Sequence, residues 1–254
     1  MFEVPGYRIE DEAGRGGWSV VYRATELASG RRVAVKAIAP EQSGEPELRS
    51  RFRRERRVAA VLEHPNVIPV LASGDGYIVM RWVDAAPLRE LLPVEPDRAA
   101  WIVADAAAAL DGLHAAGFVH RDVKTGNVLV EPGGHAYLTD FGLAKPIDAD
   151  AGLTDHGHWL GTVDYAAPEQ IRGGPTDERS DVYALGATLF HAVTGCVPYP
   201  AEDDATKMQS HLHDPPPAHE SPLDAVVRRA MAKDPVERYA SAGELGRAAL
   251  EAVA

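Results

Sequence analysis

The stretch FVHRDVKTGNVLV, residues 118–130, has two apolar ends and a centre crowded with polar and charged side chains. The apolar ends indicate packed strands or turns. The centre carries His120, Arg121, Asp122, Lys124, Thr125 and Asn127. Two interpretations are open: a solvated hairpin tip, or a site that directs Asp122, Lys124 and Asn127 at a charged partner. The rest of the chain has to decide between them.

The composition fits one large globular domain or two lobes that share a cleft. The chain has 254 residues, of which 45% are hydrophobic and 25% are charged. It has 26 Lys and Arg residues against 38 Asp and Glu residues, and the resulting net charge of −12 argues against broad nucleic-acid binding. The arginine-dense segment 49–57 is either a local basic patch or, as we expect, a solvated helix face.

A few features bear on cellular location. Cys196 is the single cysteine, so no intrachain disulfide can form and a reduced compartment is expected. The N-terminal residues lack the basic segment and apolar run of a signal peptide. The longest apolar stretches are interrupted by polar residues. We therefore expect a cytoplasmic protein without a membrane segment.

The hydrophobic periodicity changes along the chain. Residues 7–38 and 67–83 read as strands, and a helix is expected over residues 46–63 between them. Helical patterns predominate after residue 87. The sequence thus predicts an α+β fold with a small β-rich lobe followed by a larger helical lobe. The expected parts are an N-lobe at 1–83, a hinge at 81–87 and a C-lobe at 88–254.

Capping residues predict where two long helices begin and end. The first is expected to start at an Asp97 cap and to end at Gly117. The second is expected to start at a cap formed by Ser180 and Asp181 and to end at Gly195.

The segment GRGGWSVVY, residues 14–22, approximates a G-x-G-x-x-G pattern through Gly14, Gly16 and Ser19. A dinucleotide-binding fingerprint requires a helix after the glycines, whereas these glycines lead into a strand. A glycine-rich turn between two strands can instead fold over a polyphosphate and offer it backbone N–H groups. A plain hairpin turn is the alternative.

Lys36 lies on an otherwise apolar strand face in VAVKAI. A period of two places it beside Ala34 and Ile38, opposite the valines. It is either an edge residue whose ammonium reaches water, or a cation that is paired with a carboxylate and holds phosphates.

A carboxylate is available on the helix expected at 46–63. Its buried stripe is predicted to contain Leu48, Phe52, Ala59 and Leu62, and Glu55 falls on the same stripe. A buried carboxylate needs a cation, because an unpaired buried charge is costly. Pairing with Lys36 is preferred over pairing with a neighbouring arginine at the rim.

These segments together resemble the eukaryotic-type (Hanks-type) protein kinases, most closely the bacterial serine/threonine kinases. The motifs occur in the family's order from about residue 7 to residue 247: GRGGWSVVY, VAVK, the inward Glu55, HRDVKTGN, DFG, APEQ, SDVYALG and DPVERY. The resemblance implies a bilobal fold with an ATP cleft between the lobes. It also implies that residues 118–130 contain a catalytic loop.

The family's catalytic roles map onto matching residues. The resemblance implies that Asp122 accepts or orients the proton of the attacking hydroxyl and that Lys124 neutralises the transferring phosphoryl group. Lys36, held by Glu55, would grip the α- and β-phosphates. A lysine at position 124 separates the chain from typical tyrosine kinases and implies Ser/Thr phosphorylation.

The implied cofactors are ATP and a divalent metal ion. Asn127 and Asp140 of DFG would hold Mg²⁺, which prefers hard oxygen ligands and substrate phosphates, with Mn²⁺ as the alternative.

The resemblance also assigns the nucleotide pocket. The glycine-rich turn covers the phosphates, apolar side chains enclose the adenine, Met80 is the gatekeeper, and backbone groups of residues 81–83 bond the adenine edge. Arg81 stands where the family usually has an acid, which alters the electrostatics beside the ribose. The assigned residues are Gly14, Gly16, Gly17, Ser19, Val21, Ala34, Lys36, Met80, Val83 and Leu129.

Other matching residues are implied to be structural. His120 would be packed behind the loop, and Asp181 would accept N–H groups from it. Glu169 and Arg238 would form a buried ion pair, and Thr162 would contact Asp122 and Lys124. The alternative for each is an ordinary surface group.

The activation segment departs from the family's usual pattern and raises the question of a switch. Thr154 is the best candidate for a phosphorylated residue that Arg121 would receive, since a phosphate suits a guanidinium fork. The alternative is that acids such as Asp155 already satisfy Arg121. In the catalytic loop, Thr125 and Gly126 replace a usual proline and a small or acidic residue, and Gly126 is expected to loosen the loop.

The expected function is that of an active serine/threonine protein kinase acting on protein hydroxyls, with autophosphorylation in the activation segment and self-association for it in trans. A pseudokinase would be expected to lack Lys36, Asp122 or Asp140. A small-molecule kinase would usually lack the APE segment, which is present here.

Overall fold

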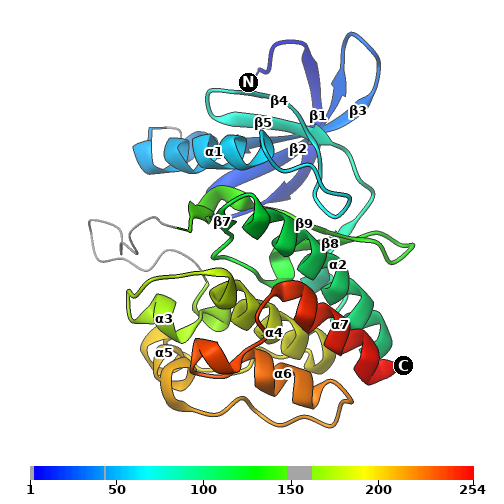
Figure 1. Cartoon of the computed structure of the whole chain (residues 1–254). Helices are drawn as coiled ribbons and strands as arrows, with labels where there is room; N and C mark the ends of the chain where they lie inside the picture. Colours follow the sequence, from blue (N-terminus) through cyan, green and yellow to red (C-terminus); the bar gives the residue numbers. More distant parts are fainter. Residues whose placement is uncertain (1–2, 43, 148–161) are drawn as a thin grey trace.

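The computed structural model describes residues 3–42, 44–147 and 162–254. Its N-terminal lobe is an antiparallel sheet of five strands in the order β1-β2-β3-β5-β4, and helix α1 lies across one face of this sheet (Figure 1). The elements of this lobe are β1 (Tyr7–Arg15), β2 (Ser19–Glu26), β3 (Arg32–Ile38), η1 (Pro40–Gln42), α1 (Pro46–Ala59), β4 (Val70–Gly74) and β5 (Tyr77–Arg81).

Strand β3 is the middle strand of the sheet and is buried on both faces. Val33 and Val35 pack into one cluster of the core, whereas Ile38 packs with Phe52 of α1 on the other face. Lys36 shares the face of Ile38 and is 5% exposed. The interpretation of Lys36 as an edge residue reaching water is therefore wrong.

The C-terminal lobe is mainly helical and lies below the sheet in Figure 1. Helices α2, α4, α6 and α7 contribute most of its core, and α7 packs along α2. Its helices are α2 (Pro96–Ala115), α3 (Pro168–Ile171), α4 (Glu178–Thr194), α5 (Asp204–His213), α6 (Asp224–Ala230) and α7 (Ala242–Val253). Its short strands are β6 (Ala86–Pro87), β7 (Phe118–Val119), β8 (Val128–Val130), β9 (Ala136–Leu138) and β10 (Lys145–Pro146). Its 3₁₀ turns are η2 (Leu88–Glu90), η3 (Thr125–Asn127), η4 (Phe141–Leu143), η5 (Val163–Tyr165) and η6 (Pro235–Glu237).

The two lobes meet where β5 gives way to β6. Strand β6 pairs with β8 of the helical lobe, so the chain crosses from one lobe to the other over residues 82–85. Asn66 also connects the lobes, because its side chain donates to the carbonyl oxygen of Ala136 at 3.0 Å. Within residues 3–42, 44–147 and 162–254, no helix combines the length and apolar character needed to cross a bilayer.

Both predicted helix starts in the C-lobe need correction. Helix α2 begins at Pro96, whose missing N–H costs nothing in the first turn, so Asp97 lies inside the helix. Helix α4 begins at Glu178 and is capped by Asp177, whose carboxylate accepts from the backbone N–H of Arg179. The predicted end of α4 is confirmed, because Gly195 at its C-terminus has a left-handed backbone with φ 74°.

Candidate active site

Lys36 is held between two carboxylates at the join of the lobes. Its Nζ donates to Oε1 and Oε2 of Glu55 at 3.0 and 2.9 Å and to Oδ1 of Asp140 at 3.0 Å. Strand β3, helix α1 and the start of η4 thus supply one group each. Glu55 is 4% exposed, so the predicted inward carboxylate pairs with Lys36 and not with an arginine at the rim.

The charges at this site compensate one another. Burial alone would lower the pKa of the Lys36 ammonium, but the carboxylates of Asp140 and Glu55 outweigh burial and raise it. Burial would likewise raise the pKa of Asp140, and the neighbouring Lys36 instead lowers it. Lys36 therefore stays charged near neutral pH, which a phosphate-binding lysine requires.

The buried stripe of α1 differs from the prediction by one residue. Leu48, Phe52 and Glu55 face inward as predicted, but the next buried side chain is Val58, and Ala59 is half-buried. The helix ends at Ala59, so Leu62 packs from the segment that follows.

The glycine-rich turn joins β1 to β2. It is closed by a hydrogen bond from the N–H of Gly16 to the carbonyl oxygen of Ser19 at 2.8 Å. A Cβ atom added at Gly14 or Gly17 would meet open space. This free space beside the backbone suits a polyphosphate, which needs close access to N–H groups.

Trp18, at the tip of this turn, points toward α1 and was not singled out from the sequence. Its ring centroid is 5.0 Å from Nζ of Lys36, and it meets the ring of Phe52 edge-on at 5.8 Å. A Cβ atom on Gly142 would lie 3.3 Å from Trp18. The indole thus connects the glycine-rich turn to Lys36, α1 and the DFG segment.

The side chains assigned to the adenine pocket lie on strands that converge on the hinge. Ala34 is opposite Met80 in the β3–β5 register, and Val21 is opposite Lys36 in the β2–β3 register. Leu129 on β8 is opposite Pro87, at the far side of residues 82–85. The strand register thus brings both lobes to the segment assigned to bind adenine.

The side chain of Arg81 reaches β9 of the C-lobe. It donates to the hydroxyl of Tyr137 on β9 at 3.0 Å, and its guanidinium lies 5.6 Å from the ring centroid. Val83, two residues further on, is half-buried. The cation at position 81 is therefore partnered within the C-lobe.

The catalytic-loop residues predicted from the opening stretch are together. Nζ of Lys124 donates to Oδ2 of Asp122 at 2.7 Å and to Oγ1 of Thr162 at 3.0 Å. The Asn127 amide donates to the backbone oxygen and to Oδ2 of Asp122, at 2.8 and 3.1 Å. This leaves the amide oxygen of Asn127 as an acceptor. The hairpin-tip interpretation is wrong, because Asn127 is only 6% exposed.

Asp181, on α4, supports this loop by accepting hydrogen bonds from its backbone. Its two oxygens accept the backbone N–H groups of His120 and Arg121, each at 2.8 Å, and Nε2 of His114 lies 2.7 Å from Oδ2. Arg121 has a left-handed backbone with φ 69°, which costs about 1–2 kcal/mol for a residue with a side chain. The buried carboxylate holds this strained turn in place.

His120 is packed and has no room to act as a base. It is fully buried, Nε2 lies 3.1 Å from the carbonyl oxygen of Thr139, and Nδ1 accepts from the N–H of Asp122. Its ring also contacts Phe141. His120 therefore fixes the catalytic loop against the segment that carries Asp140.

The donor set fits a metal ion that also binds substrate phosphates. The described residues contain no group of three or more His, Cys, Asp or Glu side chains able to hold a metal alone. Asn127 and Asp140 offer hard oxygens, and 28% of the Asp140 side chain is exposed. A divalent metal ion bound by one or two protein oxygens, phosphates and water suits this arrangement.

The chain matches a family model described as "Protein kinase domain" over residues 7–245. The chain belongs to the protein kinase family. It is 40% identical to serine/threonine-protein kinase PknD of Mycobacterium tuberculosis over 263 residues, which cover 97% of this chain and 40% of PknD. It is also 40% identical to PknH of the same species, and 38% identical to PknB of Mycobacterium leprae over 94% of this chain and 42% of PknB. The chain spans about 40% of the length of these curated relatives.

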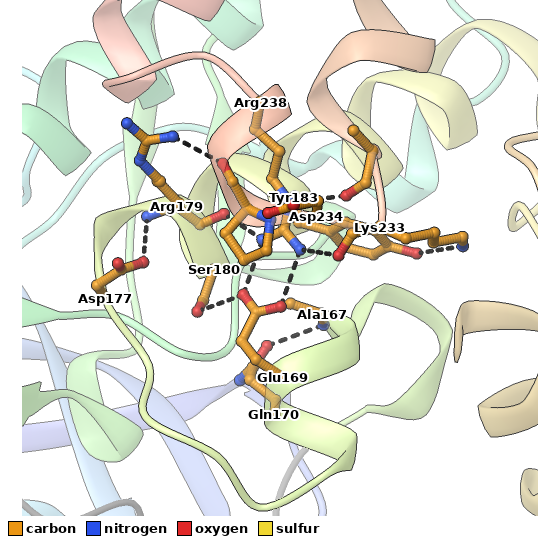
Figure 2. A network of polar contacts seen from close by, with 12 residues as sticks. Ala167, Glu169, Gln170, Asp177, Arg179, Ser180, Tyr183, Lys233, Asp234 and Arg238 are labelled. Carbon is orange, nitrogen blue, oxygen red and sulfur yellow. Dashed lines mark hydrogen bonds and ion pairs between the residues drawn. The ribbon is translucent and has the colours of Figure 1, made fainter. Parts of the chain in front are cut away.

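The C-lobe contains a largely buried ion pair between Arg238 and Glu169. Arg238 forms two parallel hydrogen bonds with Glu169, at 2.7 and 2.8 Å, and Ser180 donates to the same carboxylate (Figure 2). Arg238 also donates to the carbonyl oxygens of Ala232, Arg179 and Lys233. The arginine lowers the pKa of Glu169 despite burial, so the carboxylate remains charged.

Of the two threonines assigned to the kinase activation segment, only one is described. Thr162 contacts Lys124, as the resemblance implies, whereas Thr154 lies outside the described residues. Among the described residues, Nε of Arg121 is buried without a hydrogen-bond partner. Burial lowers the pKa of the Arg121 guanidinium, and the nearby positive charge of Arg54 lowers it further.

His114 is a supporting residue that the sequence did not reveal, since its partner Asp181 is 67 positions away. Burial disfavours the charged imidazole, but the hydrogen bond and charge of Asp181 raise the pKa of His114 above 6.5. A raised pKa in the folded state contributes stability that is fully present below about pH 6.5 and is lost as the pH rises through the folded value.

This linkage gives a pH-dependent prediction. We expect His114→Gln to lower the free energy of unfolding by roughly 1–3 kcal/mol at pH 6 and by less at pH 8.5. Urea denaturation at both pH values measures the change, with the exposed His213→Gln as a control. An equal loss at both pH values would contradict the pairing of a charged His114 with Asp181.

Proposed function

We propose that this chain is an ATP-dependent kinase that transfers the γ-phosphoryl group to serine and threonine hydroxyls of proteins. The single observation that carries the proposal is the complete set of charge-handling contacts. Lys36 is paired with both Glu55 and Asp140, and Asp122 is paired with Lys124. A binding module without activity would not need the pair of Asp122 and Lys124.

The chemistry follows from these contacts. Asp122 orients the acceptor hydroxyl and takes its proton as the oxygen bonds to the γ-phosphorus. Lys124, 2.7 Å from Asp122, lies where it can neutralise the transferring phosphoryl group. The bond from the γ-phosphorus to the bridging oxygen breaks, and ADP leaves with the phosphates that Lys36 holds.

Asn127 and Asp140 would hold Mg²⁺, or Mn²⁺ in its place, through their side-chain oxygens. When bound, the metal neutralises phosphate charge and orients the phosphates for in-line transfer. The Lys36 ammonium keeps one Asp140 oxygen in a fixed position at 3.0 Å.

Protein substrates, a cytoplasmic location and self-association for phosphorylation in trans complete the proposal. The relatives PknD, PknH and PknB carry the name serine/threonine-protein kinase, which supports protein hydroxyls as acceptors. A specific activity for autophosphorylation that rises with enzyme concentration would support reaction in trans.

Lys36→Met tests the nucleotide site. At Mg²⁺-ATP concentrations about 100 times its Kd, the wild type should melt roughly 5–10 °C higher than without nucleotide. The variant should lose most of this shift, because the phosphates lose their cation, and it should not transfer phosphate. Differential scanning fluorimetry with and without nucleotide makes each protein its own control. A full shift in Lys36→Met would contradict the assignment.

We further propose that phosphorylated Thr154 switches the kinase on by docking against Arg121. The half-buried Arg121 supports this, because its Nε atom is buried and has no partner in the described part of the chain. A phosphate would supply the missing acceptor and charge.

The switch predicts that Thr154→Ala and Arg121→Ala each lower activity toward an exogenous protein roughly 5–150-fold. Mass spectrometry of autophosphorylated wild type should place a phosphate on Thr154. Full activity of Thr154→Ala would instead indicate a constitutively active kinase, in which acids of the segment satisfy Arg121.

A further inference from the structure

Three side chains from different elements form a chain of hydrogen bonds, here called the relay, that starts in the catalytic loop. Oγ1 of Thr125 lies 3.0 Å from the hydroxyl of Tyr165, and that hydroxyl lies 2.6 Å from Nδ1 of His191. Thr125 starts η3 directly after Lys124, Tyr165 ends η5, and His191 lies on α4. The Tyr165 and His191 rings are also stacked, with centroids 5.9 Å apart.

Two members of the relay, Thr125 and Tyr165, are shielded from water, and His191 is half-buried. Thr125 is 2% exposed and Tyr165 is 7% exposed. Burial lowers the pKa of His191 and raises the pKa of Tyr165, so both are neutral at neutral pH. Tyr165 can then donate to Nδ1, and Thr125 can donate to the oxygen of Tyr165. Hydrogen bonds in such a desolvated place are strong and costly to leave unmade.

Two further contacts tie the segment around Tyr165 to the same loop. Lys124 donates to Thr162 at 3.0 Å, and the Gln170 side chain donates to the backbone oxygen of Arg121 at 3.2 Å. Neither of these contacts reaches α4. The Thr125–Tyr165–His191 relay therefore anchors both the loop and the segment to a buried helix of the core.

The segment anchored in this way lies beside the reacting groups. Asp122, Thr162, Tyr165 and Ala166 line one small cavity. An acceptor hydroxyl has to come within hydrogen-bond distance of the Asp122 carboxylate. A protein substrate must therefore approach next to residues 162–166, and the position of this segment affects the alignment of its hydroxyl.

We propose that Thr125 and His191 are positioning residues for the protein substrate, acting through Tyr165. The proposal rests on the kinase activity proposed above. Thr125 is a departure from the family's usual proline, which has no hydroxyl, so this anchor is a feature of the present chain. Removing it should misalign the acceptor hydroxyl while leaving the nucleotide contacts of Lys36 intact.

Two pairs of matched variants test the relay. Thr125→Val removes the hydroxyl and Thr125→Ser retains it. His191→Phe retains the ring without an acceptor, and His191→Asn offers an amide oxygen near the position of Nδ1. We expect Thr125→Val and His191→Phe to lower kcat/KM for a peptide roughly 10–100-fold, with the KM for ATP within twofold of wild type. Thr125→Ser and His191→Asn should recover most of the peptide activity.

Hydrogen exchange provides a readout that does not depend on activity. The amides of residues 162–167 should exchange faster in Thr125→Val than in Thr125→Ser, while those of α2 remain unchanged. Wild-type peptide activity in Thr125→Val, or equal exchange in the Val and Ser variants, would overturn the proposal. If the wild type were inactive but the exchange difference were observed, the proposed function would be refuted, while the structural anchoring of residues 162–167 by the relay would still be supported.

Discussion

Replacing Asp122 with Asn should lower kcat for phosphorylation of a protein substrate roughly 10²–10⁴-fold, the usual contribution of a positioned general base. Asn has nearly the same shape, so the contacts from Lys124 and Asn127 to this position can persist while the carboxylate is lost. The stabilisation by Mg²⁺-ATP in a thermal melt should be largely retained, because Asp122 acts on the acceptor hydroxyl and not on the phosphates.

The difference between Asp122→Asn and Lys36→Met in the nucleotide-induced shift is the diagnostic result. Lys36→Met should lose both the nucleotide shift and the transfer, whereas Asp122→Asn should lose only the transfer. Asp204→Asn, on the exposed side of α5, serves as the control for replacement of a carboxylate. Wild-type transfer by Asp122→Asn would show that residues 118–130 had been assigned the wrong chemistry.

The largest expected effect on stability is at Arg238. Arg238→Met should lower the free energy of unfolding by about 3–5 kcal/mol, because it leaves the buried carboxylate of Glu169 uncompensated. The loss includes the hydrogen bonds from the guanidinium to three carbonyl oxygens as well as the ion pair. The midpoint of urea denaturation measures this effect.

Two further variants separate charge burial from the loss of contacts. Arg228→Met breaks an exposed ion pair with Asp224 and should cost at most about 1 kcal/mol. Adding Glu169→Gln to Arg238→Met should restore part of the stability, since the unpaired charge is gone. A cost for Arg238→Met no larger than that for Arg228→Met would contradict the structural role of the buried pair.

The predictions that succeeded depended on local periodicity. Alternation along β3 placed Lys36 on the correct face, and the spacing on α1 placed Glu55 on the buried stripe. Each pattern depends only on the geometry of one element. The pairing of Lys36 with Glu55 then followed from one assumption, that the buried stripe of α1 packs against the face of β3 that carries Lys36. The error of one residue at Ala59 reflects the end of the helix, where the spacing no longer applies.

The failures involve contacts between distant segments. Local sequence context predicted a helix cap at Ser180 and Asp181, whereas Asp177 caps the helix. Only the family resemblance predicted that the Asp181 carboxylate accepts N–H groups of the catalytic loop. His114 pairs with Asp181 across 67 positions, and Thr125 pairs with Tyr165 across 40. No local pattern encodes such pairs, which depend on how the loop folds against α4.

The central claim is tested most directly by incubating the purified wild-type chain with Mg²⁺ and ATP labelled at the γ-phosphate, in the presence of a mixed protein substrate, and then analysing the phosphorylated amino acids. We predict label on serine and threonine and not on tyrosine, with the rate of labelling at least about 100-fold lower when Asp122→Asn replaces the wild type. Nucleotide-induced stabilisation without any transferred label would contradict the claim and identify a nucleotide-binding module in its place.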